Sequence, residues 1–215
     1  MSIIKKMKDP VSSLTHMAWA ILAVPVTVVL IIMSLNSGGR HIISFIVFGI
    51  SLILLYTASA VYHMIAKPEL QQILKKIDHS MIFVLIAGTY TPICILILNG
   101  IWGVGILASV WITAAVGIIL KVFWNMPRVV SAGIYVIMGW ASLVAFAPLS
   151  AAMPLGGLLL LIGGGLVYTL GAIIYAAKWQ PVNLKFFGFH ELFHIFVMAG
   201  TVCHVILMFI YVLPA

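Results

Sequence analysis

The stretch FFGFHELFHIFVMAGTVCHVILMFIYVL, residues 186–213, decides the fold class of this chain. It is almost entirely apolar over more than the ~20 residues that an α-helix needs to cross a bilayer. It also carries His190, Glu191 and His194. Ionisable side chains are costly inside a membrane, so those that occur there usually have a function. The stretch therefore predicts a transmembrane helix that contributes to a functional site.

His190 and His194 are four residues apart, so a helix places both imidazoles on one face, one turn apart. With Glu191 they match the pattern H-E-x-x-H, in which the two histidines bind zinc and the glutamate can act as a general base. Such a pair near a helix end could equally contact lipid headgroups. Taken alone, the pattern leaves a metal site and an interfacial pair open.

The composition places the whole chain in the membrane. Of its 215 residues, 64% are hydrophobic and only 7% are charged, whereas a soluble domain carries about 25% charged residues. A soluble fold of this size could not bury so much apolar surface. The cysteines, Cys94 and Cys203, lie within apolar runs and predict no disulfide framework. The net charge of +7 fits loop charge that orients a membrane protein, so we expect no nucleic-acid partner.

Seven apolar runs are separated by short turns and polar links, and each is close to or above the length of a membrane-spanning helix. The expected spans are residues 14–35, 42–65, 77–98, 101–123, 129–147, 155–177 and 186–213. The first run is long and lacks a small-residue cleavage site, so we expect a retained span and not a signal peptide. The sequence therefore predicts an all-α fold, a single seven-transmembrane-helix bundle over residues 1–215.

The basic residues predict the orientation of this bundle. With the N-terminus in the cytosol, ten of the eleven basic residues fall in inner segments and only Arg40 falls in an outer one. The ten are Lys5, Lys6, Lys8, Lys67, Lys75, Lys76, Lys121, Arg128, Lys178 and Lys185. Cytosolic segments of membrane proteins carry such an excess of positive charge. We therefore expect a cytosolic N-terminus and an external C-terminus.

This topology brings several polar residues to one depth at the inner end of the bundle. His63 ends the second span, and Ser59 lies one turn deeper on the same helix face. Asp78 opens the third span, and His190 and His194 lie one and two turns into the seventh. His16 and His79 also lie at this end, whereas His41 lies at the outer turn and His204 lies nearly three turns beyond His194.

Three histidines from two helices, with an open fourth position, describe a zinc site of the catalytic type. Zinc would lower the pKa of a bound water to about 7. Asp78 is the first candidate to accept or orient the proton of that water, and Glu191 is the second. Ser59 could hydrogen-bond the water or the oxyanion of a tetrahedral intermediate.

Each of these residues also has an ordinary explanation. His63 could cap its helix, Ser59 could hydrogen-bond its own backbone, and Asp78 is favoured by the helix dipole. A helix–helix hydrogen bond would explain His204. These separate explanations do not predict that the residues share one depth, so the convergence favours a common site.

The same residues, in this order, resemble the bacterial hemolysin III family. This family belongs to the progestin and adipoQ receptor superfamily, which includes the adiponectin receptors. The resemblance runs from about Asp9 to Tyr211 and is carried by Leu14-Thr15-His16, Ser59-Ala60-Val61-Tyr62-His63, Ile77-Asp78-His79-Ser80 leading to residues 87–92, and His190 through His194. The opening motif departs from the family, which often has an acidic residue followed by Asn before Thr-His. Asp9 is the nearest acid here.

The resemblance implies a multi-pass protein of the bacterial cytoplasmic membrane. It also implies Zn²⁺ held by His63, His190 and His194, with a water near Asp78. The wider group includes alkaline ceramidases and is proposed to hydrolyse lipid amides, so we expect a membrane lipid or fatty-acyl substrate.

Two other functions stay open. A non-enzymatic lipid sensor or a pore-forming protein is suggested by the family name and by the glycine-rich sixth span, although the spans have few polar residues to line a wide aqueous channel. An intramembrane zinc protease is suggested by H-E-x-x-H itself. That class needs a further carboxylate ligand on a later helix, and no acidic residue follows Glu191.

Overall fold

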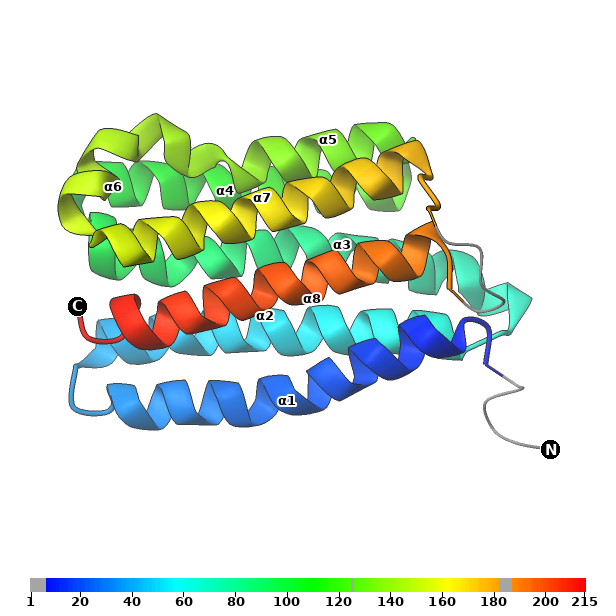
Figure 1. Cartoon of the computed structure of the whole chain (residues 1–215), viewed down its shortest axis with the longest axis horizontal. Helices are drawn as coiled ribbons and strands as arrows, with labels where there is room; N and C mark the ends of the chain where they lie inside the picture. The colour runs from blue at the N-terminus through cyan, green and yellow to red at the C-terminus, as the bar shows by residue number, and fades with distance from the viewer. Residues whose placement is uncertain (1–6, 125, 182–186) are drawn as a thin grey trace.

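The computed structural model describes residues 7–124, 126–181 and 187–215, which form a bundle of helices (Figure 1). The elements are α1 (Pro10–Ser34), α2 (Gly39–Met64), α3 (Pro68–Pro92) with the π-helical turn η2 (Ile93–Leu98), α4 (Gly100–Phe123), α5 (Arg128–Gly139), the 3₁₀ turn η3 (Ala141–Ala145), α6 (Phe146–Ala152), α7 (Leu155–Ala177), α8 (Phe189–Leu207) and the π-helical turn η4 (Met208–Val212). The start of α1 and the end of η4 lie at opposite ends of the bundle.

Seven helical segments in the described part of the chain are long and apolar enough to cross a membrane. They are Pro10–Ser34, Gly39–Met64, Pro68–Leu98, Gly100–Phe123, Arg128–Ala152, Leu155–Ala177 and Phe189–Val212. Each corresponds to one of the seven expected spans, so the predicted all-α seven-helix bundle is confirmed. The predicted and observed bounds of the spans differ at several helix ends.

Two helices begin with a proline that lies ahead of the expected start of the span. The first starts at Pro10 and the third at Pro68. Proline is well tolerated at the first helical position, because the N–H that it lacks would have no partner there. The polar segment before residue 77 therefore continues the third helix beyond its apolar part. Residue 186, where the seventh span was expected to begin, lies outside the described residues, as do Lys5, Lys6 and Lys185.

The fifth span is not one continuous helix. Its chain changes from α5 to η3 after Gly139 and then to α6, which includes Pro148 in its first turn, where proline is tolerated. The hydroxyl of Tyr90 donates to the Gly139 carbonyl at 2.6 Å and accepts the Ser142 N–H at 3.0 Å. Irregular backbone at membrane depth is stable only where other protein groups satisfy it. Tyr90, on α3, supplies those hydrogen bonds.

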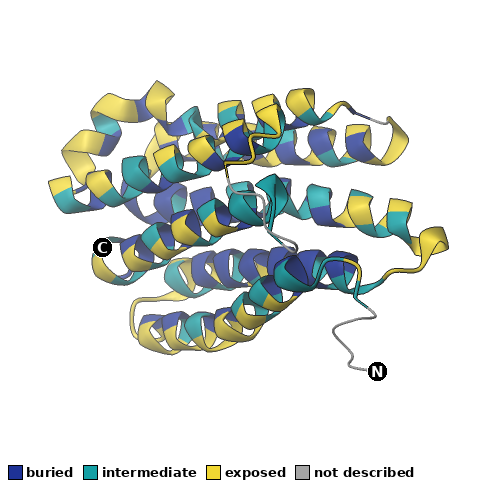
Figure 2. Ribbon diagram, turned by 45° about the vertical axis from the view of Figure 1, so that its right-hand side comes forward, coloured by how far each residue is buried: buried dark blue, intermediate teal, exposed yellow. Residues whose placement is uncertain are grey.

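The two most buried spans, α2 and α3, form the centre of the bundle. The helix α1 packs on α2, α3 packs on α4, and α7 packs on α8, while α8 lies between α2 and α7 in Figure 1. Phe45, Phe48, Leu52 and Tyr56 form a buried stripe along α2 at helical spacing. The buried residues lie on the parts of the ribbons that are turned toward the interior, and the exposed residues lie on the outside of the bundle (Figure 2). The polar side chains of α2, α3 and α8 therefore meet inside the bundle.

Gly103 and Gly105 offer a matched test of helix packing in α4. A Cβ atom on Gly103 would collide with the carbonyl oxygen of Cys94, a backbone atom that cannot rotate away, whereas a Cβ on Gly105 meets nothing within 4 Å. We expect Gly103→Ala to destabilise the protein by about 1–3 kcal/mol through overpacking. Gly105→Ala should leave stability unchanged or slightly raised. Unfolding of both variants in detergent micelles measures the difference, and equal stabilities would contradict this packing.

Candidate metal centre

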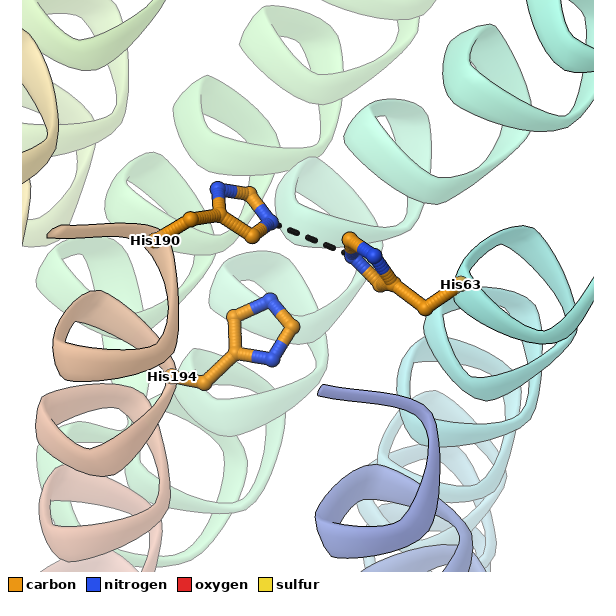
Figure 3. A group of neighbouring side chains, drawn as sticks. All are labelled: His63, His190 and His194. Atoms are coloured by element: carbon orange, nitrogen blue, oxygen red, sulfur yellow. Dashed lines mark hydrogen bonds between the residues drawn. The ribbon is translucent and has the colours of Figure 1, made fainter. Parts of the chain in front are cut away.

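Three histidines converge between α2 and α8. His63 lies in the last turn of α2, and His190 and His194 lie in the first two turns of α8 (Figure 3). Each can offer one ring nitrogen, and the three nitrogens lie within 4.8 Å of one another. His63 and His194 are buried, and His190 is partly buried. The structure thus brings together the three residues that the sequence predicted as metal ligands.

The arrangement of these rings fits a zinc ion. Two nitrogens bound to one tetrahedral zinc lie about 3.3 Å apart, because each Zn–N bond is about 2.0–2.1 Å long. The Nε2 atoms of His63 and His190 are 3.1 Å apart and share the hydrogen bond dashed in Figure 3. The ring of His194 lies beside both, with its centroid 5.0 Å from that of His63 and 4.6 Å from that of His190. Neutral imidazoles in apolar surroundings suit a cation of zinc's intermediate softness.

Asp9 contacts His63 on the side of its ring opposite to the other two histidines. Its Oδ2 atom accepts a hydrogen bond from Nδ1–H of His63 at 2.9 Å, and its backbone N–H donates to the His63 carbonyl at 3.0 Å. A proton on Nδ1 leaves the Nε2 lone pair of His63 facing the other histidines. The hydrogen bond from His63, helped by the nearby ammonium of Lys8, holds the pKa of the Asp9 carboxyl below its ordinary value despite partial burial. Asp9 therefore stays an anionic acceptor at neutral pH.

Asp78 and Ser59 lie beside the histidines, as the sequence predicted. Both are buried, with 6% and 1% of their surface exposed. The Ser59 hydroxyl lies near the Asp78 carboxyl. Both side chains line the cavity that His190 and His194 also line. The structure places these two polar groups next to the three histidines, and their catalytic roles stay predictions.

That cavity extends from the histidines along the interior of the bundle, between α3, α5, α7 and α8. Its far end is lined by Leu143, Phe146, Leu149 and Leu158. The groups at the histidine end are polar, whereas most of the remaining lining is aliphatic or aromatic. The cavity therefore has the shape and chemistry to receive an apolar chain with a polar group at one end.

A family model described as Haemolysin-III related matches residues 4–205. The chain belongs to the hemolysin III family. It is 37% identical to Hemolysin-3 of Bacillus cereus over 206 residues, which cover 94% of this chain and 91% of that protein. It is 38% identical to the Hemolysin-3 homolog of Bacillus subtilis (strain 168) over 192 residues, which cover 88% and 87% of the two chains.

A plant protein is also similar. Heptahelical transmembrane protein 5 of Arabidopsis thaliana is 30% identical over 173 residues, which cover 68% of this chain and 44% of that protein. Together with the seven apolar helices, the bacterial relatives identify this hemolysin III protein as a multi-pass bacterial membrane protein.

Glu191, the second residue of the H-E-x-x-H pattern, uses both carboxylate oxygens in structural contacts. Its Oε2 atom accepts the N–H of Gly188 at 2.8 Å, and its Oε1 atom accepts the hydroxyl of Ser12 at 2.8 Å. The first contact caps the start of α8, and the second ties α8 to the first turn of α1. These contacts favour a structural role for Glu191 over the role of general base that the pattern suggested.

Three further histidines, His16, His79 and His204, lie outside the group of three. His16, on α1, stacks against His194. His79 lies against Tyr175 and also lines the cavity, and its carbonyl accepts the hydroxyl of Tyr135. His204 lies against α7, where a Cβ atom on Gly164 would be 2.8 Å from its Nε2 atom. His204 therefore packs against α7, but neither of its ring nitrogens has a hydrogen-bond partner among the described residues, so the helix–helix hydrogen bond expected for His204 is not found.

Asp9→Ala should weaken zinc binding about 10- to 100-fold, because it removes the acceptor that orients His63. Asp9→Asn keeps an acceptor oxygen without the charge and should show a smaller loss. Competition with a chromogenic chelator measures both affinities. Lys8→Ala is the control, because it removes the ion pair to Asp9 and leaves the hydrogen bond to His63. Zinc affinity unchanged in Asp9→Ala would rule out this orienting role.

Glu191→Gln should keep the metal content of the protein and, if the protein hydrolyses a lipid, its turnover of that lipid. Glutamine is close to glutamate in shape and can accept the Gly188 N–H and hydrogen-bond Ser12, but it cannot act as a base. Glu191→Ala should instead lower stability by about 1 kcal/mol, the usual cost of losing a helix cap. Zinc analysis, turnover and thermal unfolding of the two variants separate these effects. Loss of turnover in a folded, zinc-loaded Glu191→Gln protein would restore the glutamate as a candidate base.

Proposed function

We propose that this hemolysin III protein is a zinc-dependent membrane hydrolase of a lipid amide or ester. One observation carries the proposal: three imidazole donors, a carboxyl group and a hydroxyl group meet at one end of a long apolar cavity. His63, His190 and His194 would hold the zinc ion. When bound, the metal would supply a Lewis acid at the polar end of the cavity.

The remaining polar residues have distinct proposed roles. Asp78 would accept the proton of the attacking water, since its carboxyl lies at the polar end of the cavity with Ser59 beside it. Ser59 would donate a hydrogen bond to the carbonyl oxygen as negative charge develops on it. The buried position of both groups excludes bulk water, which strengthens these interactions.

The cavity supports an acyl chain as the bulk of the substrate. Its aliphatic lining would hold the chain, and the polar residues would meet the scissile amide or ester at its end. We further propose that this end faces the cytosol, because the described lysines and Arg128 lie in loops and helix ends on this side of the bundle, whereas Arg40 lies at the other end. The site would then act on lipids of the inner leaflet.

A lipid sensor without turnover is the second candidate, and the same cavity favours it. A protein that binds an acyl chain could respond to membrane composition through its helices alone. The mostly apolar lining speaks against an aqueous pore, since a water-filled channel needs polar groups along its length.

Purified protein should carry close to one zinc ion per chain, and His194→Ala should lose both the metal and lipid turnover. Asp78→Asn should retain zinc and lose turnover by about 10²- to 10⁴-fold, the usual contribution of general acid–base catalysis. Metal analysis and lipid-resolved mass spectrometry measure the two quantities. Zinc retained in His194→Ala would refute the proposed ligands. Full zinc content with no turnover across amides and esters would favour the sensor.

A further inference from the structure

His63 and His194 are held in different ways. The ring of His63 is fixed by the hydrogen bond from its Nδ1–H to Asp9. In His194 the Nδ1 atom is buried and has no hydrogen-bond partner. A histidine that binds a metal almost always donates its second ring nitrogen to an acceptor, which sets the plane of the ring. The plane of His194 must therefore be set by another contact.

That contact is the ring of His16. The two imidazoles are nearly parallel, with an interplanar angle of 13° and centroids 3.8 Å apart. His16 is only 3% exposed, and neither of its ring nitrogens has a hydrogen-bond partner. It is also not one of the three residues whose nitrogens could share a metal ion. What His16 offers to the site is the flat face of its ring.

His16 is itself held by an aromatic column that also includes Tyr56 and Trp19. His16 and Tyr56 pack edge to face, with ring centroids 5.0 Å apart and an angle of 83°, and Trp19 stacks on Tyr56 with centroids 5.5 Å apart. The hydroxyls of Tyr56 and Thr201 are hydrogen-bonded at 2.7 Å. Thr201 lies on α8, two turns beyond His194. The contacts therefore run from His194 on α8 to His16 on α1, then to Tyr56 on α2, and return to α8 at Thr201.

We infer that His16 is a positioning residue that fixes the ring plane of His194 by stacking. Tyr56 packs against His16, and Trp19 packs against Tyr56, so both help to hold His16 in place. The inference rests on the proposed metal centre. It assigns a role to His16, the histidine of the Thr-His pair, which neither the metal ligands nor the acid–base groups explain. This role requires a planar ring at position 16 and does not require the ring nitrogens.

The test compares His16→Phe, which keeps a flat ring and loses both nitrogens, with His16→Ala, which loses the ring. The measurements are zinc affinity by chelator competition and the visible absorption spectrum of the cobalt-substituted protein, which reports ligand geometry. His16→Ala should bind zinc about 10- to 100-fold more weakly, the range seen for lost orienting contacts, and its cobalt bands should shift. His16→Phe should match the wild type in both measurements.

Phe45→Ala is the matched control. Phe45 is fully buried in the N-terminal half of α2, and its ring contact is with His41, outside the column. Its loss should lower the unfolding temperature and leave the cobalt spectrum unchanged, which separates positioning from general destabilisation. If the metal-free His16→Ala protein does not fold, His16→Leu fills the space without a planar ring and should show the same weakened binding.

Two results would overturn the inference while the metal centre stands. One is that the folded variant without a ring, His16→Ala or His16→Leu, has the same zinc affinity and the same cobalt spectrum as the wild type. The other is a loss in His16→Phe as large as in that variant, which would assign the role to the nitrogens. A wild-type protein that binds neither zinc nor cobalt would refute the proposed metal centre itself.

Discussion

The first turn of α1 holds together the end of the bundle where the three histidines lie. Asp9 contacts both the backbone and the ring of His63, and the hydroxyl of Ser13 donates to the Ala60 carbonyl at 3.0 Å on the same helix. Ser12 reaches across to Glu191 on α8. These hydrogen bonds fix α2 relative to α8, so the spacing between His63 and the α8 histidines depends on α1, which supplies no proposed ligand.

The surrounding lipid explains why most buried polar groups of the described spans are paired within the bundle. An unsatisfied polar group is expensive in an apolar medium, so each buried donor or acceptor needs a partner within the chain. Tyr90 satisfies the irregular backbone of the fifth span, and Thr201 joins Tyr56 and Tyr168 across three helices. Where ring nitrogens stay unpaired, as in His194 and His16, a bound ligand or a tightly packed ring must account for them.

Much of the candidate site could be predicted from the sequence, because charge and histidine are rare in the spans. The depth shared by His63, Asp78 and His190 follows from where they lie along their helices, and the structure brings these residues together. Asp9 and Glu191 were harder to interpret. The signal for Asp9 was its place just ahead of the Thr-His pair, and nothing in the local pattern showed which residue it contacts. Glu191 matched a motif in which the glutamate acts as a general base. Its hydrogen bonds to Gly188 and Ser12 favour a structural role instead.

The sequence by itself determined the membrane class, the number of spans, the family and the depth of each polar residue, because hydropathy and position along a helix are local properties. Only the tertiary structure decided which side chains meet. That depends on the rotation of each helix about its axis and on its neighbours, which follow from packing across the whole bundle. This packing turned Glu191 towards Ser12, placed Asp9 behind His63 and stacked His16 on His194.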